Sequence, residues 1–419
     1  MKVAVIGSGI SGISAAEYLC DSCEVTVFEK DTRVGGHADT QTIDVGGQLI
    51  DVDTGFIVFN PDNYPRFYQL LKKYQVDYQD SDMSFAVSNR FSGLEYNATN
   101  LNKLFCQRKN LLNPKFYRMI RDIQRFYKEA RALLDDNAAE IPLGDYLRQN
   151  GYSEYFIDEH IIPMASALWS GKADLIMDFP ARYLVAFMQN HNMMQINDRP
   201  VWKTITGGSK RYLSAITEKA NFDVRLNSSI QKVVRTEDTV TLTMAGGEEE
   251  HFDNVIFACH SDQALSLVEK PTADEERILG AIKYQKNDIC LHWDEALLPK
   301  RKAAWASWNV IRNEASKEQC TVSYCMNLLQ SLPTKQPVVV SLNMNELVDK
   351  SKVWKYLEYD HPIYTIETIS AQKERSKLQG QKSTYYCGAY WGWGFHEDGA
   401  RSGLEAAQQL LSDNGYAEK

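Results

Sequence analysis

Long apolar runs are missing from this chain of 419 residues. No stretch of roughly 18 or more consecutive apolar residues is present, so no membrane-spanning helix is expected. A basic, apolar secretory leader is missing too, because a short apolar strand, Lys2–Ile6, begins at the second residue. We therefore expect a cytoplasmic protein. The chain also lacks positive charge overall: its net charge is −9, which argues against a nucleic-acid partner.

Paired cysteines and metal-ligand clusters are also scarce. The eight cysteines are scattered, which is typical of reduced cytosolic proteins and not of a disulfide framework. Cys20 and Cys23 have the spacing of a redox motif, but no second CxxC or histidine pair lies nearby. We interpret them as structural and expect no metal site. A second nucleotide fingerprint is missing between residues 100 and 380, which disfavours a pyridine-nucleotide-disulfide reductase.

What the chain does have is a complete dinucleotide-binding unit at its start. An apolar strand leads into a G-x-G-x-x-G turn at residues 7–12, a small-residue helix pattern follows, and a second apolar strand ends on Glu29. The first glycine permits the sharp turn, the second lets the backbone approach a pyrophosphate, and the third lets the helix pack closely on the strand. The helix N-terminus attracts phosphate, and Glu29 can accept hydrogen bonds from ribose hydroxyls. The predicted cofactor contacts are Gly7, Ser8, Gly9, Ile10, Ser11, Gly12 and Glu29.

The residues directly after this unit indicate which dinucleotide binds. Residues 29–36 read E-K-D-T-R-V-G-G. This resembles the E-x-x-x-R-x-G-G extension of flavoproteins in the amine oxidase superfamily, such as monoamine oxidases, protoporphyrinogen oxidases and phytoene desaturases. The resemblance implies FAD as the cofactor. Arg33 can pair with a phosphate, and the two glycines let the backbone approach the pyrophosphate. The contacts predicted here are Lys30, Arg33, Gly35, Gly36 and His37.

Three further segments carry the resemblance. Thr54-Gly55-Phe56 resembles the segment that passes beside the isoalloxazine ring, and Ile230 falls where the superfamily contacts the adenine through its backbone. Residues 384–404 read as a strand, an aromatic-glycine loop and a helix. The resemblance implies that this helix N-terminus faces the pyrimidine end of the flavin. The contacts implied in the loop and helix are Gly394, Phe395, Glu397, Asp398 and Gly399.

Aromatic and methionine residues are dense between residues 142 and 200, which is typical of a core and also of an apolar substrate cavity. A C–C desaturation would need a base, and His396 is the candidate, because it lies in the cofactor loop and imidazole titrates near neutrality. The alternative is that His396 only hydrogen-bonds the helix N-terminus or the flavin. On the substrate side we place Trp202, Tyr390, Trp391 and Trp393.

The resemblance covers nearly the whole chain and implies an α/β fold. Its parts are a Rossmann-like FAD-binding domain of the amine oxidase and glutathione reductase type, and a substrate domain with a mixed β-sheet and helices; both are discontinuous in sequence. We predict the FAD-binding domain at residues 1–60, 200–268 and 380–419, and the substrate domain at residues 61–199 and 269–379.

Several motifs resemble more specifically a group of bacterial NAD/FAD-binding proteins that are often encoded beside cyclopropane-fatty-acid synthases. They include Leu168-Trp169-Ser170, Arg199-Pro200 and Gly394-Phe395-His396. The resemblance implies an FAD-dependent oxidoreductase that oxidises a fatty-acyl or other lipid chain by hydride transfer to flavin N5. Two alternatives stay open, because fold kinship does not fix function. One is an amine oxidase acting on a small amine or polyamine, and the other is a non-catalytic flavin-binding partner of a lipid-modifying enzyme.

Residues 101–135 form a basic, mostly helical stretch in an otherwise acidic chain. One interpretation is a surface that meets an anionic membrane or another acidic partner. The other is an ordinary solvated helix face, which the sequence alone favours.

Overall fold

The structure is a computed structural model. Ser170 and Arg199, which carry part of the resemblance above, lie outside the residues that it describes. The described residues are 1–135, 140–169, 173–195, 200–314 and 321–416.

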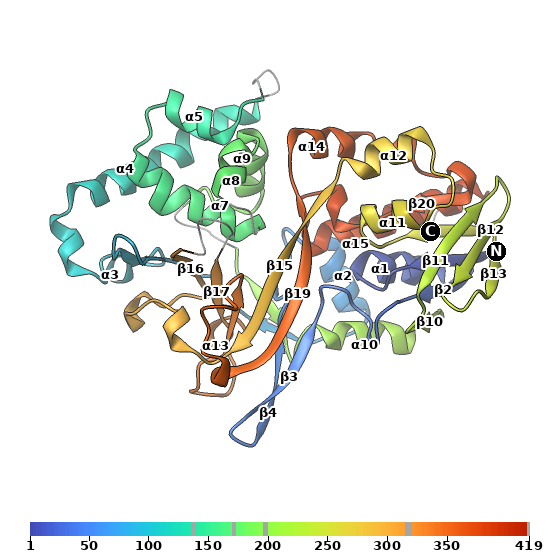
Figure 1. The fold of residues 1–419 in the computed structure, drawn as a ribbon, viewed down its shortest axis with the longest axis horizontal. Helices are drawn as coiled ribbons and strands as arrows, with labels where there is room; N and C mark the ends of the chain where they lie inside the picture. Colours follow the sequence, from blue (N-terminus) through green and yellow to red (C-terminus); the bar gives the residue numbers. More distant parts are fainter. Residues whose placement is uncertain (136–139, 170–172, 196–199, 315–320, 417–419) are drawn as a thin grey trace.

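A five-stranded parallel sheet forms the end of the molecule that holds both chain termini (Figure 1). Its central strands are buried on both faces, which explains why they read as unbroken apolar runs. α1 (Ile10–Leu19) and α15 (His396–Asp413) pack together and share one apolar cluster with the sheet. In spatial order the strands are β10 (Asp223–Arg225), β2 (Glu24–Phe28), β1 (Lys2–Ile6), β14 (Asn254–Phe257) and β20 (Thr384–Tyr386).

A second apolar cluster joins the sheet to a three-stranded antiparallel sheet and two helices. These elements are β11 (Ile230–Arg235), β12 (Val240–Met244), β13 (Glu249–Phe252), α11 (Ser261–Leu267) and α12 (Ala273–Gly280). Nearby lie α10 (Lys210–Lys219) and α14 (Ile366–Lys373). The α/β fold with a Rossmann-like domain is thereby confirmed.

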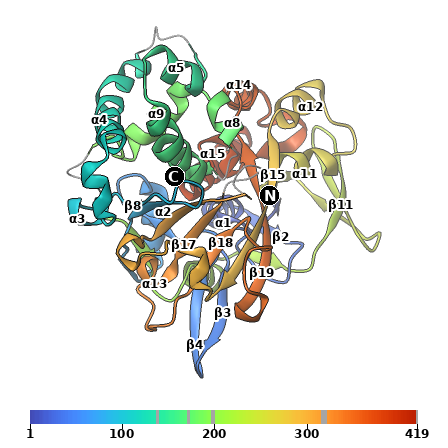
Figure 2. The same ribbon diagram turned by 60° about the vertical axis from the view of Figure 1, so that its left-hand side comes forward.

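A seven-stranded mixed sheet runs through the middle of the molecule (Figures 1 and 2). All its strand pairs are antiparallel except β7 with β16. The longest pair, β15 with β19, extends from Lys283 opposite Ile363 to His292 opposite Val353. In spatial order the strands are β19 (Val353–Ile363), β15 (Lys283–His292), β18 (Val339–Leu342), β17 (Val322–Cys325), β16 (Trp308–Arg312), β7 (Phe85–Asn89) and β8 (Glu95–Asn97).

A group of helices lies at the other end of the molecule and encloses the largest apolar cluster (Figure 1). Its members are α3 (Leu101–Leu104), α4 (Pro114–Glu129), α5 (Leu143–Gln149), α6 (Glu154–Phe156), α7 (Ile162–Trp169), α8 (Ala173–Asp178) and α9 (Ala181–Asn190). None of the helices in the described ranges is both long enough and apolar enough to cross a bilayer.

Short elements connect the two ends. The β3–β4 hairpin projects from the middle of the molecule, and a small sheet of order β5-β9-β6 joins residues before and after the helical group. The pairing of the strands does not test the predicted domain boundaries, which stay a prediction. The connecting elements are β3 (Thr40–Val45), β4 (Gln48–Asp53), β5 (Val58–Phe59), β6 (Tyr78–Asp80), β9 (Lys203–Ile205), α2 (Pro65–Lys73) and α13 (Met326–Leu329).

Candidate active site

The turn between β1 and α1 has the close packing that its three glycines predict. Gly7 has φ +110°, and a Cβ there would lie 2.9 Å from the Ala258 carbonyl oxygen. A Cβ on Gly12 would collide with the Gly7 carbonyl group. A Cβ on Gly9, in contrast, would meet no atom within 4 Å. Gly9 therefore borders open space in front of the α1 N-terminus, as a pyrophosphate site requires.

Glu29 connects this turn to the loop that leads into β11. Its Oε2 accepts hydrogen bonds from Ser8 N at 3.0 Å and Ser8 Oγ at 2.5 Å. Its backbone carbonyl accepts from Ser228 N at 2.8 Å. The segment before Ile230 therefore lies beside Glu29, as the expected adenine-side contact requires, while Lys30 is exposed. The ribose and adenine contacts themselves stay predictions.

The Arg33 guanidinium group contacts its own loop, and its predicted pairing with a phosphate stays a prediction. It donates to the carbonyl oxygen of Gly36 at 2.9 Å and forms an ion pair with Asp39 at 2.9 Å. The arginine therefore holds the glycine loop in shape. Gly35 forms an isolated β-bridge with Gly9, and a Cβ on Gly36 would lie 3.4 Å from the Gly9 Cα. The two predicted phosphate loops thus lie side by side.

The N-termini of α1 and α15 converge on this same place. A Cβ on Gly399 would lie 2.6 Å from Ile10 Cγ2 and 3.0 Å from Ser11 Oγ. A Cβ on Gly403 would collide with the Ser11 carbonyl group, with the carbon at 2.9 Å. Because glycine lets the helices touch, the partial positive charges of two helix ends combine. The open position at Gly9 and these two ends fit the anionic pyrophosphate and the electron-rich pyrimidine end of an FAD.

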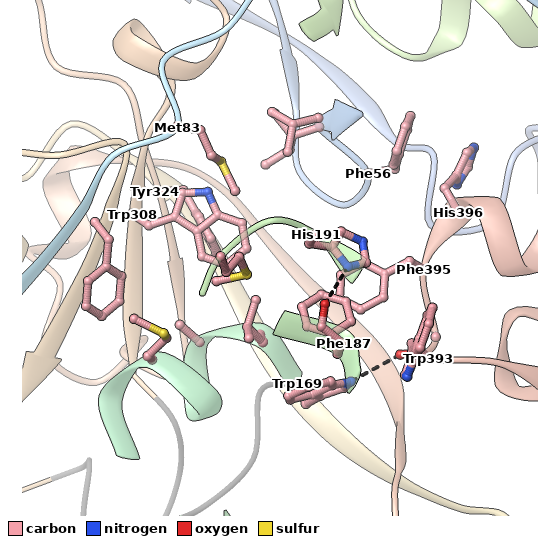
Figure 3. Close-up of a pocket in the computed structure, with 18 of the residues that line it drawn as sticks. Phe56, Met83, Trp169, Phe187, His191, Trp308, Tyr324, Trp393, Phe395 and His396 are labelled. Carbon is pink, nitrogen blue, oxygen red and sulfur yellow. Dashed lines mark hydrogen bonds between the residues drawn. The ribbon is translucent and has the colours of Figure 1, made fainter. Parts of the chain in front are cut away.

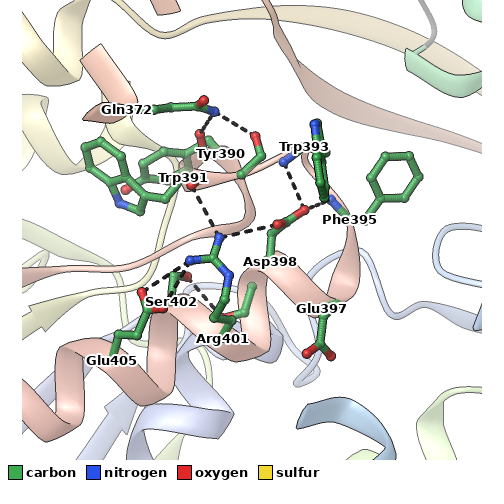
Figure 4. Close-up of polar contacts among 12 residues, drawn as sticks. Gln372, Tyr390, Trp391, Trp393, Phe395, Glu397, Asp398, Arg401, Ser402 and Glu405 are labelled. Atoms are coloured by element: carbon green, nitrogen blue, oxygen red, sulfur yellow. Dashed lines mark hydrogen bonds and ion pairs between the residues drawn. The ribbon is translucent and has the colours of Figure 1, made fainter. Parts of the chain in front are cut away.

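Asp398 fixes the aromatic-glycine loop in front of α15 (Figure 4). Its Oδ2 accepts hydrogen bonds from Trp393 N at 3.0 Å and Phe395 N at 3.1 Å, and Arg401 lies 3.4 Å from its Oδ1. Burial raises the pKa of this carboxyl group. Asp398 therefore organises the loop that the cofactor prediction involves.

The Glu397 side chain contacts the start of α2, and its predicted contact with the cofactor stays a prediction. Its two carboxylate oxygens accept hydrogen bonds from Arg66 N at 2.9 Å and Phe67 N at 3.0 Å, at the first turn of α2. Burial raises the pKa of Glu397 to about 7. The carboxylate predicted to contact the cofactor is thus occupied in capping α2.

A cavity of ≈ 340 Å³ begins at this loop and continues between the seven-stranded sheet and the helical group (Figure 3). Aromatic rings and methionines supply most of its wall. Predicted cofactor or base residues that line it are His37, Thr54, Gly55, Phe56, Gly394, Phe395 and His396. Lining residues from the helical group and the seven-stranded sheet include Phe85, Tyr127, Met164, Trp169, Trp308 and Tyr324.

The titratable side chains among the described residues of the cavity wall are tyrosines and histidines. No Asp, Glu, Lys or Arg is among the described residues that line it. Burial lowers the pKa of His37 and His191 to about 4, and that of His361 and His396 to about 3. These four imidazoles are therefore neutral near pH 7.

A chain of amide hydrogen bonds sets the tautomer of His361. The backbone N–H of Asp288 donates to Asn343 Oδ1 at 2.9 Å, so the Asn343 Nδ2 is the group that donates to Asn287 Oδ1 at 2.8 Å. Asn287 Nδ2 must then donate to His361 Nδ1 at 2.9 Å. Since His361 is neutral and Nδ1 accepts, its hydrogen is on Nε2. The cavity wall thus contains an imidazole with a donor Nε2–H.

His191 has the opposite tautomer. Its Nδ1 lies 3.0 Å from the Phe187 carbonyl oxygen, which can only accept, so the hydrogen is on Nδ1 and Nε2 is an acceptor. His396, the predicted base, stacks on Phe56 with ring centres 3.7 Å apart and hydrogen-bonds the Tyr212 hydroxyl at 2.9 Å. Its low pKa and these contacts count against proton abstraction, and its role stays a prediction.

The four predicted substrate residues fall into two pairs. Trp202 and Trp393 line the cavity, but Tyr390 and Trp391 are 3% and 5% exposed and belong to the core cluster behind the parallel sheet. A short 3-10 helix, Ala389–Trp391, turns these two rings away from the cavity. The sequence reasoning also missed His191, which directly follows α9, and His361 on β19. Their only signal was a polar residue inside an aromatic-rich segment.

Comparison with known proteins identifies the family. The model of the family described as "Flavin containing amine oxidoreductase" matches residues 10–287. This chain belongs to that family. The family is one of flavin-containing oxidoreductases, and membership implies a flavin cofactor, typically FAD.

Individual relatives are distant. The chain is 22% identical to an L-amino-acid oxidase of Siganus canaliculatus over 306 residues, which are 68% of this chain and 55% of the oxidase. It is 37% identical to a carotenoid 3,4-desaturase of Haloarcula japonica over 79 residues, 19% of this chain and 15% of the desaturase. A solved cyclohexylamine oxidase from Brevibacterium oxydans IH-35A shares the fold, with a TM-score of 0.69, 15% identity and 99% coverage of both chains. The chain thus spans about half the length of the first relative, and the relatives' activities differ from one another.

Proposed function

We propose that this flavoenzyme oxidises an uncharged, apolar substrate, a fatty-acyl or other lipid chain. The observation that carries the proposal is the cavity wall, in which the described residues include no Asp, Glu, Lys or Arg. An isolated charge transferred from water into such a wall costs several kcal/mol unless a counter-ion is supplied. A hydrocarbon chain has no such cost, and methionine and aromatic side chains pack adaptably around it.

The chemistry follows from the family and the neutral wall together. When bound, FAD supplies an acceptor for a hydride from the substrate. The aromatic wall excludes water, and the donor Nε2–H of His361 and the acceptor Nε2 of His191 can orient a polar group at the end of the chain. Both imidazoles act as neutral hydrogen-bonding groups, since their pKa values are about 3 and about 4.

An amine oxidase is the second candidate. Trp202 and Trp393 at the cavity wall could hold an amine against aromatic rings. A polyamine or amino acid, however, is charged near pH 7 and would need a carboxylate or guanidinium partner that the described wall does not offer. The amine candidate is therefore restricted to a small neutral amine. The expected cytoplasmic location is independent of this choice and also stays a prediction.

Anaerobic mixing tests the proposal. An unsaturated phospholipid in detergent should bleach the flavin absorbance, and an aliphatic diamine should not. Met164, which is 8% exposed and lines the cavity, offers a matched pair of variants. Met164→Glu should slow bleaching by lipid about 100-fold, because it places a carboxylate in the apolar wall, whereas Met164→Leu should keep it. Bleaching by the diamine but not by lipid would refute the lipid proposal. No bleaching by either, in a folded protein that holds FAD, would favour the non-catalytic alternative.

A further inference from the structure

The most basic part of the chain lies at the far end of the molecule from both termini (Figure 1). Residues 101–121, which we call the basic segment, contain six Lys or Arg residues and no Asp or Glu, in a protein of net charge −9. Among the described residues, only Arg118 of these six lies within ion-pair distance of a carboxylate, that of Asp122 at 3.8 Å. The six are Lys103, Arg108, Lys109, Lys115, Arg118 and Arg121.

Large apolar side chains are exposed on the same segment. Leu101 is 76% exposed and Leu112 is 90% exposed, while Leu111 and Tyr117 are about half exposed at 46% and 48%. Of these four residues only Tyr117 lies on α4, and that helix buries other residues, among them Phe116 at 0%. The segment therefore presents leucines and cations together to its surroundings.

Local structure holds these leucines outward. Asn100 caps α3 by accepting from Lys103 N at 2.9 Å, so Leu101 occupies the first helical position. Leu112 ends the 3-10 helix Arg108–Leu112, and Asn113 then caps α4. Because caps fix both backbone turns, exposure of the leucines is built into the fold.

The cavity reaches the same end of the molecule. Ala98, just before α3, and Tyr127, on α4, both line it. Phe105 and Ile120 of the basic segment pack against the apolar cluster that surrounds this part of the cavity. The distal end of the cavity thus lies beneath the basic segment.

We propose that the basic segment docks on a bilayer that contains anionic lipid. Exposed leucines insert among acyl chains, and the cations attract the charged headgroups. A nucleic-acid partner would account for the cations and leave the leucines unexplained. The entry of an acyl substrate from the bilayer into the cavity rests on the proposed function, but the docking itself does not.

Flotation with vesicles tests the docking. The FAD-loaded full chain should bind vesicles of phosphatidylcholine mixed with phosphatidylglycerol, should bind phosphatidylcholine alone much more weakly, and should be released by salt. Lys109→Ala and Lys115→Ala should each lower the partition coefficient about five-fold. Leu112→Asp should lower it at least as much. The matched control is Leu49→Asp, at a 72% exposed leucine on the β3–β4 hairpin, which should leave binding unchanged.

Absence of binding to the anionic vesicles would overturn the proposal, and so would an equal loss in the control variant. Retention of duplex DNA or of an acidic protein without vesicle binding would also overturn it. The flavin content and melting temperature of each variant establish that it is folded. If vesicles bind in the predicted pattern while lipid fails to bleach the flavin, the docking surface stands and the lipid-substrate proposal falls.

Discussion

The contact between α1 and α15 gives the sharpest prediction, and Gly403→Ala is the change that tests it. A Cβ on Gly403 would collide with the Ser11 carbonyl group, with the carbonyl carbon at 2.9 Å and the Cα at 3.1 Å. All three nearest atoms belong to the backbone, so no side chain can rotate away. Overpacking of this kind costs about 1–3 kcal/mol. Alanine recovers about 1 kcal/mol of helix propensity, so we expect a net loss of about 1 kcal/mol in the free energy of unfolding.

A matched variant separates packing from helix propensity. Gly280 also lies in a helix, α12, and the nearest atom to a Cβ there is Leu265 Cδ2 at 3.9 Å. Gly280→Ala should leave stability unchanged or raise it slightly. Urea denaturation of both variants measures the difference, and flavin fluorescence after dialysis measures FAD retention, which should fall only for Gly403→Ala. A Gly403→Ala protein as stable as the parent, with full FAD content, would refute the inference that the two helix ends must touch.

Three further predictions concern polar groups. The pKa of Glu397 is about 7 in the folded protein and lower in the unfolded chain. The free energy of unfolding should therefore fall as pH rises to 7, by at most about 1.4 kcal/mol per pH unit. Glu397→Gln should flatten that slope, measured by urea denaturation at a series of pH values. Asn287→Asp replaces the donor to His361 Nδ1 with an acceptor. The hydrogen of the imidazole should then move to Nδ1 and the pKa of His361 should rise, both measured by ¹⁵N NMR. An unchanged imidazole spectrum would contradict the proposed chain of amide hydrogen bonds. Arg235 and Glu275 form an ion pair only 2% and 3% exposed, so Arg235→Met should destabilise by about 3–5 kcal/mol, and the double variant with Glu275→Leu should recover most of it.

The sequence predicted best what is local in the chain. The turn at Gly7, Gly9 and Gly12 depends on backbone geometry within about thirty residues, and the resemblance to known flavoproteins extended it to the C-terminal helix. Glu397 was predicted from the same motif, but its partner is α2, whose first turn lies about 330 residues away in sequence. No local pattern records such a contact.

The sequence also could not show which side chains of the aromatic-glycine loop face the cavity. Trp391 and Trp393 are two residues apart, yet one is in the core and the other lines the cavity, because the 3-10 helix Ala389–Trp391 ends at the first of them. Asn287 and His361 meet only through the register of two antiparallel strands, in which Asn287 pairs with Tyr359 and Gln285 with His361. Register of this kind is fixed by the whole sheet and not by either strand alone.

The position of the cavity explains why the family is plain while the substrate is not. The family match ends at residue 287, within β15. Part of the wall comes later in the chain, from Trp308 and Tyr324 on the seven-stranded sheet, His361 on β19 and Trp393 in the C-terminal loop. Cofactor binding depends on close backbone approach at glycines, whereas a cavity wall can change its side chains without moving the sheet. A substrate can therefore be inferred only from the wall itself, and the described residues of this wall include no Asp, Glu, Lys or Arg.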